Sequence, residues 1–233
     1  QSRESNRSNL GGLMYNFGLI FSKLITSNLE LTASATYSPS SELTSDNSRT
    51  YSTIVLDPIT EQEFTVNSSE IDLSISNLAT TKLTLPSKTS FGFGVGAPRK
   101  WFAGVEYTYL KASQFSNRLL TIDNATYQDA STLSIGGFYI PKYDSFTSYL
   151  SRVTYRVGAR FEETGIVLNN QPIEDFGITF GLGLPVGGLS KINIGVELGQ
   201  LGTLDGGLIK ENYANIMLGF SLSDIWFIKR KYD

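Results

Sequence analysis

The sequence contains neither cysteine nor histidine, and each absence removes a class of function. Without cysteine the chain has no disulfide framework and no thiolate site. Without histidine it lacks the commonest general base and the commonest metal ligand in proteins. Carboxylates and hydroxyls remain, but none stands beside an evident base. The sequence therefore predicts a protein that is not an enzyme and that uses no metal and no cofactor.

Two further absences limit the partners and the kind of membrane span. The chain has 19 Lys and Arg against 22 Asp and Glu, a net charge of −3, so nucleic acid is not an expected partner. No stretch approaches the roughly 20 consecutive apolar residues of a transmembrane helix. Any segment that crosses a membrane must therefore be a strand.

Residues 151–163, SRVTYRVGARFEE, carry the clearest strand pattern. The odd-numbered positions from Val153 to Phe161 are apolar, whereas the even-numbered ones are Arg, Thr, Gly or Glu. Successive side chains of a strand point to opposite faces, so the pattern predicts one apolar and one charged face. Its length also suits a tilted strand that crosses a bilayer, which needs about 9–11 residues.

The same alternation recurs along the chain and predicts nine strands, at about 13–21, 29–37, 89–97, 101–109, 132–140, 151–163, 176–184, 192–198 and 214–222. Short connections are expected at 24–28, 97–100, 141–149 and 186–190, and long loops at 39–78, 112–128, 163–175 and 202–211. The first long loop has room for a small hairpin at about 51–66. Outer-membrane barrels alternate short periplasmic turns with long extracellular loops in this way.

We therefore predict an all-β fold, a transmembrane antiparallel β-barrel over residues 1–223, followed by a charged periplasmic tail at 224–233. In this arrangement the first strand enters from outside. A barrel whose chain starts in the periplasm would then have an odd number of strands before residue 1. The expected location is the outer membrane of a Gram-negative bacterium.

A soluble β-sandwich also has alternating strands, and glycine separates the two folds. The predicted polar face carries Gly92, Gly94, Gly96, Gly104, Gly158, Gly177, Gly181, Gly183, Gly195, Gly199 and Gly219. On a solvated sheet such glycines only weaken strands. Inside a closed barrel they relieve crowding and permit curvature. The glycines therefore favour the membrane barrel.

The apolar face carries aromatic residues, many of them near the predicted strand ends. They are Trp101, Tyr107, Tyr109, Tyr155, Phe161, Phe176, Phe180 and Phe220. Aromatic side chains near both membrane interfaces form the girdles of outer-membrane barrels. We expect this set to face outer-membrane lipids rather than a ligand.

Charged residues on the opposite face are candidates for a functional site. Arg152, Arg156 and Arg160 share one face of one predicted strand and would form a column on the lumen wall. The acids expected on the inner side are Glu106, Glu162, Asp175 and Glu197. The arginines either guide a carboxylate or another anion, or pair with these acids and brace the barrel. We favour bracing, because like charges that are removed from water need partners.

Three segments resemble the FadL/TodX family of outer-membrane channels for long-chain fatty acids and aromatic hydrocarbons. They are Leu85-Pro86 with the alternation at 90–96, YRVGARF at 155–161, and FGITFGLGLP at 176–185. The resemblance implies a 14-stranded barrel with an N-terminal plug, of which this chain would supply the C-terminal strands. The plug and its Asn-Pro-Ala segment are not in this sequence, so no ligand-site residue is carried over.

Two functions follow from these observations. The resemblance implies passive uptake of a hydrophobic small molecule, such as a fatty acid or hydrocarbon. The alternative is an accessory or scaffold barrel that holds other outer-membrane proteins in a secretion or assembly complex. A transporter should have an apolar lumen, whereas an accessory barrel can be filled by its own charges. A third possibility, a soluble barrel that binds a lipid inside, predicts extraction without detergent.

Overall fold

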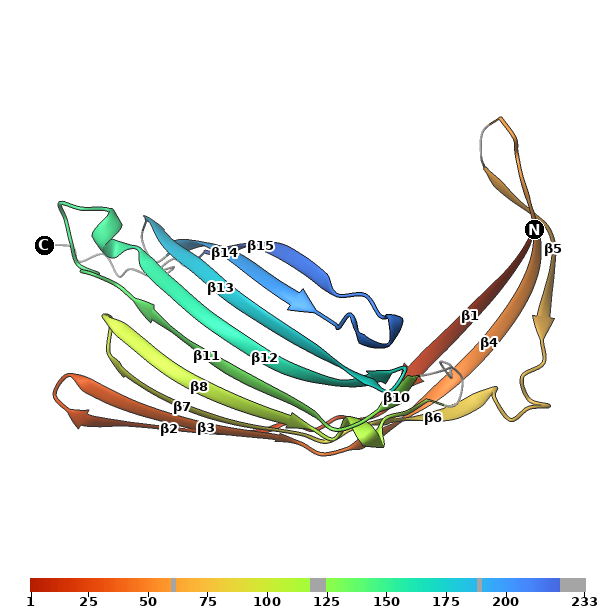
Figure 1. Cartoon of the computed structure of the whole chain (residues 1–233), viewed down its shortest axis with the longest axis horizontal. Helices are drawn as coiled ribbons and strands as arrows, with labels where there is room; N and C mark the ends of the chain where they lie inside the picture. Colours follow the sequence, from red (N-terminus) through yellow and green to blue (C-terminus); the bar gives the residue numbers. More distant parts are fainter. Residues whose placement is uncertain (60–61, 118–124, 188–189, 223–233) are drawn as a thin grey trace, which may run out of the picture.

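The computed structural model describes residues 1–59, 62–117, 125–187 and 190–222. Two antiparallel sheets contain most of these residues (Figure 1). No helix among them is long and apolar enough to cross a membrane. The predicted tail at 224–233 lies outside the described residues.

The larger sheet contains the nine predicted strands, each paired in chain order with the next. They are β2 (Phe17–Thr26), β3 (Leu29–Ser38), β7 (Lys88–Ala97), β8 (Trp101–Leu110), β11 (Ala130–Tyr139), β12 (Thr154–Leu168), β13 (Gln171–Gly187), β14 (Ser190–Leu201) and β15 (Glu211–Ser221). The short β10 (Ala125–Tyr127) adds to β12. We call this the barrel sheet, and its antiparallel order confirms the predicted fold class.

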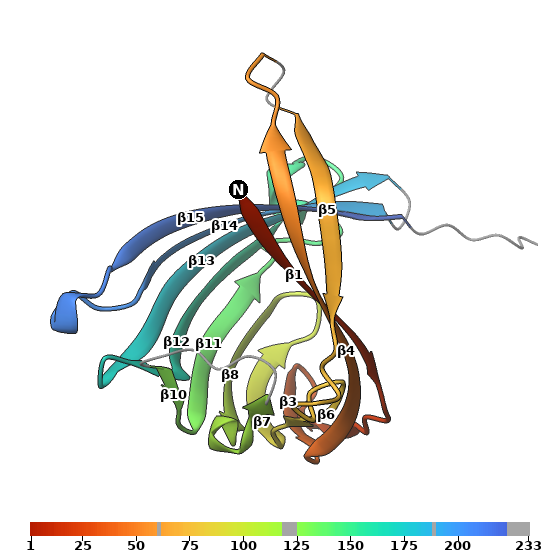
Figure 2. The ribbon, with the colours of Figure 1, turned by 90° about the vertical axis from the view of Figure 1, so that its right-hand side faces the viewer.

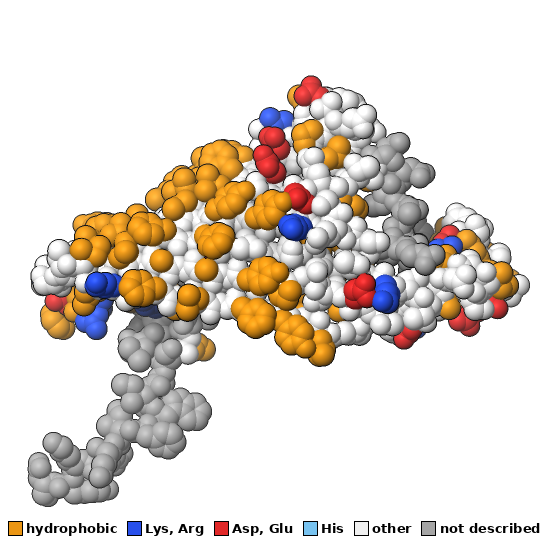
Figure 3. Space-filling model, turned by 90° about the horizontal axis from the view of Figure 1, so that it is seen from below, with side chains coloured by type: hydrophobic (Ala, Val, Ile, Leu, Met, Phe, Trp, Pro, Cys, Tyr) orange, Lys and Arg blue, Asp and Glu red, His pale blue; other side chains and the backbone are white. Residues whose placement is uncertain are grey.

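The barrel sheet is curved into a trough, as Figures 1 and 2 show. Alternate side chains point to its concave and convex faces, and the register keeps each set aligned from strand to strand. The convex face is covered with hydrophobic side chains over most of its length (Figure 3). Within the described residues the sheet is open, with β2 and β15 at its two edges.

The connections lie at the two ends of the trough, but they do not sort by length as the sequence predicted. The turns after β2 and β7 and the connection at residues 140–153 lie at one end, which we call the short-turn end (Figure 1). Residues 140–153 nevertheless form a longer connection than the β12–β13 turn and the β14–β15 connection at the other end, the long-connection end. A second expectation was also wrong: residues 163–175 are not a loop, because β12 and β13 run on to a two-residue turn at Asn169 and Asn170. Both asparagines have positive φ, which polar Asn tolerates better than most residues.

A second sheet replaces the loop predicted at 39–78. It contains β1 (Ser2–Gly11), β4 (Ser41–Leu56), β5 (Glu63–Ile71), β6 (Thr80–Leu85) and β9 (Ser116–Asn117). The small hairpin expected at 51–66 is present in longer form as β4 and β5. Residues 1–223 therefore do not all belong to the barrel sheet, since five strands lie beyond its long-connection end (Figure 2).

Polar side chains hold this second sheet together. The side-chain amide of Asn47 donates to the carbonyl oxygen of Leu78 at 2.9 Å and to Thr81 Oγ1 at 3.0 Å. Its oxygen accepts from Ser8 and Ser45, each at 2.7 Å. Because most side chains of these strands are polar, their apolar alternation is short and weak. For that reason the sequence pattern indicated a loop.

The connection between β8 and β11 is pinned at Asp129. The Ser113 hydroxyl and the Tyr109 hydroxyl both donate to the carboxylate. These hydrogen bonds, that of Ser113 first, hold the pKa of Asp129 below its ordinary value. A short 3₁₀ turn, Ala112–Gln114, is thereby fixed against the end of the barrel sheet.

The β12–β13 turn gives a direct test of this geometry. Asn170 has φ 61°, so Asn170→Ala should lower the free energy of unfolding by about 1 kcal/mol, because a Cβ is disfavoured there. Asn170→Gly should be neutral or stabilising. Urea unfolding of the vesicle-inserted protein, followed by tryptophan fluorescence, measures both. Equal stability of the Ala and Gly variants would contradict the left-handed turn.

Candidate functional site on the lumen wall

The concave face of the barrel sheet, which we call the lumen wall, is mainly polar or glycine. It presents Thr32, Ser34, Ser90, Gly92, Gly94, Gly104, Glu106, Thr132, Ser134, Gly136, Arg156, Gly158, Arg160, Gly177, Thr179, Gly181, Asn193, Gly195, Glu197, Gly199, Tyr213 and Asn215. Apolar side chains on this face are fewer; Phe102 and Phe138 stack with ring centroids 6.1 Å apart.

Arg160 is the centre of the densest cluster on this wall. Its guanidinium pairs with Glu162, with Asp175 Oδ2 at 2.8 Å and with Glu197 Oε1 at 3.2 Å. These partners come from β12, β13 and β14, so one side chain joins three neighbouring strands. The side chains of Asp175 and Glu197 are only 12% and 15% exposed. An arginine can hold several carboxylates because its planar head presents five donors.

Tyr213 closes the cluster from β15. Its hydroxyl donates to Asp175 Oδ1 at 2.8 Å and accepts from Arg160 Nη2 at 3.2 Å. The ring lies directly over Gly199, where an added Cβ would fall 2.2 Å from Tyr213 Cζ. The inward glycine predicted from the sequence is thus required by a close approach. Four consecutive strands are joined through this one group of side chains, which we call the Arg160 cluster.

The other two predicted arginines have different environments. Arg156 donates to Asn193 Oδ1 at 2.9 Å on the same wall. Arg152 is not on the strand: it ends a 3₁₀ turn, Leu150–Arg152, and its guanidinium lies 5.4 Å from the centre of the Tyr149 ring. The predicted column of three arginines is therefore wrong, because β12 begins only at Thr154.

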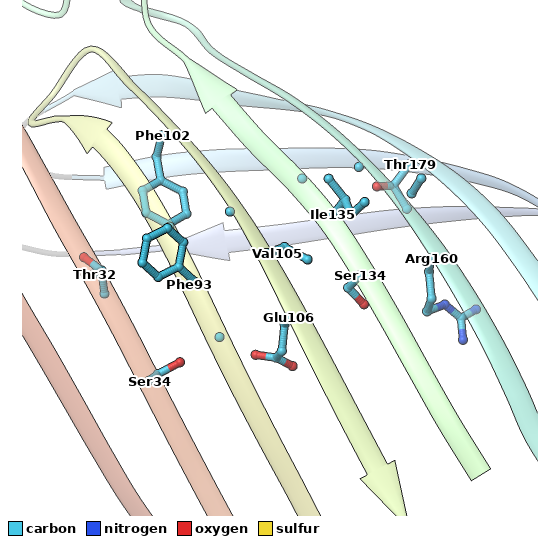
Figure 4. A pocket seen from close by; sticks show the side chains of 16 residues that line it. Thr32, Ser34, Phe93, Phe102, Val105, Glu106, Ser134, Ile135, Arg160 and Thr179 are labelled. Carbon is cyan, nitrogen blue, oxygen red and sulfur yellow. The ribbon is translucent and has the colours of Figure 1, made fainter.

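Glu106 lies on the lumen wall as predicted, in one row with Arg160. Ser134 pairs in register with both residues, so the two charges are separated by two strand spacings, about 10 Å. Figure 4 shows Glu106, Ser134 and Arg160 along this row. They line a hollow of about 470 Å³ together with Thr32, Ser34 and Thr179. Among the described residues, Glu106 has no ion pair with Arg160.

The predicted aromatic girdle lies on the opposite, convex face. Trp101, Tyr107, Tyr155, Phe161, Phe176, Phe180 and Phe220 are all exposed. Tyr109 is half-buried, because its hydroxyl is bonded to Asp129. Phe161 and Phe176 face each other across β12 and β13, with ring centroids 4.7 Å apart. Their contact with lipid stays a prediction.

Sequence reasoning missed Tyr213 and Asn193 as partners of the arginines. The sequence did contain a signal for Tyr213. Tyr213 lies two residues before Asn215 and four before Met217, so the three alternate residues share the face of the strand that was predicted to point inward. The register that places it beside Gly199 could be known only from the paired strands. Over the described part of the chain, no group of three or more acids is arranged to hold a metal ion. The ion pairs and hydrogen bonds of the Arg160 cluster join neighbouring strands of the lumen wall.

Removing Arg160 tests the bracing role. Arg160→Met leaves three acids without their shared cation and should lower the free energy of unfolding by about 2 kcal/mol. That is less than the ~3–5 kcal/mol of fully buried pairs, because Arg160 keeps 32% exposure. Adding Asp175→Asn and Glu197→Gln should recover most of the loss. Arg156→Met, the matched control, should cost about 1 kcal/mol. Urea unfolding in vesicles measures all three.

A second substitution tests the close approach at Gly199. Gly199→Ala should force Tyr213 off Asp175 and cost about 1–3 kcal/mol of unfolding free energy. In a Tyr213→Ala background the same change should cost far less, so that the two effects are not additive. Gly219→Ala is the control, since the nearest atom to its Cβ is Asn193 Cβ at 3.8 Å. Additive effects of the two substitutions would contradict the packing described above.

Comparison with known proteins places the chain in a family. A family model described as BamG matches residues 1–233, the full sequence. No curated protein matches. Among solved structures the chain is similar to the CymD monoaromatic hydrocarbon channel, with a TM-score of 0.50 and 13% sequence identity. The match covers 90% of this chain and 50% of that one.

This likeness shows the fold, and the chain spans half of the channel's length. Three observations point to the same cellular location, the bacterial outer membrane: the antiparallel barrel sheet, its apolar convex face and the family match. The chain is an outer-membrane β-barrel protein of a bacterium. By its match over all 233 residues, it belongs to the BamG family.

Proposed function

We propose that this protein is an accessory barrel subunit of an outer-membrane complex that secretes or assembles proteins. The observation that carries the proposal is the lumen wall, which is lined by glycine, hydroxyl and charged side chains and is braced by the Arg160 cluster. Membership of the BamG family fits this role.

A path for a hydrophobic cargo needs apolar contacts on the lumen side. A hydrocarbon that passes the Arg160 cluster would remove charged groups from water without replacing their hydrogen bonds, which is costly. The hollow beside the cluster is lined by Glu106, Arg160, Ser and Thr, but also by glycines and by apolar residues such as Phe102 and Ile135. The proposed rigidity of the wall therefore rests on the Arg160 cluster and not on this hollow.

The second sheet supplies a surface for partner proteins. Strand β5 is exposed along its whole length and, among the described strands, pairs with β4 alone. The hairpin presents Val55, Phe64 and Val66, all more than half exposed. Figure 2 shows this hairpin rising away from the barrel sheet. Exposed apolar residues on a projecting arm are typical of a protein interface.

The second candidate function is passive uptake of a hydrophobic compound. The fold similarity to a solved monoaromatic hydrocarbon channel favours it, as does the stacked Phe102–Phe138 pair on the lumen wall. In this alternative, lipid-like cargo would contact the aromatic pair. The Arg160 cluster would then lie beside the route.

Purification of the full-length protein in mild detergent distinguishes the two functions. We expect other outer-membrane proteins to co-purify in fixed ratio, and no fatty acid or hydrocarbon to be found by mass spectrometry. The triple variant Val55→Thr, Phe64→Thr and Val66→Thr should lower the yield of these partners at least about fivefold, because an apolar anchor contributes most of an interface's free energy.

The matched control changes the opposite edge of the same sheet, Ser5→Thr, Arg7→Thr and Asn9→Thr on β1, and should leave the partners bound. Both variants should unfold in urea at the same concentration as the unmodified protein. A lone barrel that carries stoichiometric hydrophobic cargo would overturn the accessory role and establish uptake instead.

A further inference from the structure

The short-turn end of the barrel sheet carries a concentration of positive charge. Two connections, 98–100 and 140–153, contribute Arg99, Lys100, Lys142 and Arg152 against a single acid, Asp144. The whole chain, by contrast, has more acids than bases. All four cations are exposed, and none of them forms an ion pair within the described part of the chain. In Figure 3, Lys and Arg side chains gather at this end of the apolar surface.

One backbone and one side-chain hydrogen bond join the two connections into one unit. The N–H of Ile140 donates to the carbonyl oxygen of Lys100 at 2.6 Å, and Arg99 Nη1 donates to Tyr143 Oη at 3.2 Å. Arg99 occupies a left-handed position with φ 62°, which glycine would adopt without steric cost. A charged side chain at a strained backbone position points to a role for the charge.

Apolar and aromatic side chains surround these cations. Phe146 is fully exposed, and Tyr143, Tyr149 and Leu150 of the same loop are also exposed. The Tyr155 hydroxyl donates to the carbonyl oxygen of Leu150 at 3.1 Å, which fixes the loop to a residue of the convex face. Aromatic rings mixed with Lys and Arg are typical of the membrane interface.

An apolar groove of about 660 Å³ lies on the convex face next to this unit. Small residues form its floor, since Ala103 on β8 pairs in register with Gly137 on β11. Ile135, Tyr139, Tyr155 and Val157 line its sides. Ala103 is three residues from Lys100, about 10 Å along the strand. The cations of the two connections and the apolar groove therefore follow one another along the direction of the strands. A phospholipid needs this arrangement, because its phosphate and its acyl chain are joined end to end.

We propose that this end of the barrel binds one phospholipid of the periplasmic leaflet. Its phosphate lies against Arg99, Lys100 and Lys142, and one acyl chain fills the groove over Ala103 and Gly137. The leaflet follows from the rule that short turns face the periplasm. Glu30 shares a small hollow with Arg99 on the concave side, so the phosphate approaches from the convex side.

Native mass spectrometry of the full-length protein with added phosphatidylglycerol tests the site. We expect a discrete one-lipid adduct. The triple variant Arg99→Gln, Lys100→Gln and Lys142→Gln should weaken its binding at least about tenfold, since each cation near an anionic surface contributes about fivefold. The control, Arg7→Gln, Lys111→Gln and Lys210→Gln, removes the same charge at the other end and should bind as the unmodified protein does.

Two further measurements separate a lipid from free phosphate or a protein. Ala103→Phe fills the groove and should weaken the adduct, whereas Ala214→Phe, elsewhere on the convex face, should not. Inorganic phosphate at the same concentration should fail to displace the lipid. The proposal is overturned if the Arg99, Lys100 and Lys142 variant binds the lipid as tightly as its control variant does. It is also overturned if inorganic phosphate displaces the lipid while Ala103→Phe leaves lipid binding unchanged. Loss of a co-purified protein, with lipid binding unchanged, would also overturn it.

Discussion

Each inner strand of the barrel sheet pairs its backbone with a neighbouring strand on both sides, and the rest of the structure depends on that constraint. Backbone groups inside a bilayer have no water to bond, so a membrane span built of strands must be paired throughout. Pairing fixes the register, and the register fixes which side chains face the lumen and which face outward. The apolar convex face and the polar lumen wall are two consequences of the same ladder.

A polar lumen wall has its own physical problem, because its charges are partly removed from water. The Arg160 cluster solves it by sharing one guanidinium among carboxylates of three strands. Glycine makes this possible: Gly199 leaves room for the Tyr213 ring that completes the group. The cluster thereby links β12 to β15 with side chains as well as with the backbone. The accessory role that we propose rests on this bracing of the wall.

The two ends of the barrel sheet differ in architecture and in charge. At the long-connection end, a second sheet of polar strands extends the protein beyond the barrel and exposes the β4–β5 hairpin. At the short-turn end, compact turns concentrate positive charge beside an apolar groove. We propose that the first end contacts partner proteins and that the second contacts lipid headgroups. The barrel sheet holds the two surfaces at fixed positions.

The sequence by itself determined the barrel sheet. An alternation of period two, with glycine on one face, predicted all nine strands and their order, because that pattern is local and is repeated in each strand. It also indicated that Arg152, Arg156 and Arg160 pair with Glu106, Glu162, Asp175 and Glu197. Of these, the structure shows ion pairs of Arg160 with Glu162, Asp175 and Glu197.

Only the tertiary structure decided the rest. The second sheet has hydroxyl and amide groups on both faces, so its strands leave only a short and weak periodic signal and depend on long-range partners such as Asn47 with Thr81. Arg152 does not lie in the predicted column, because it belongs to a 3₁₀ turn that precedes β12. Tyr213 belongs to the Arg160 cluster because the register between β14 and β15 places it beside Gly199. Such contacts are set by where distant segments meet, which no local pattern of residues encodes.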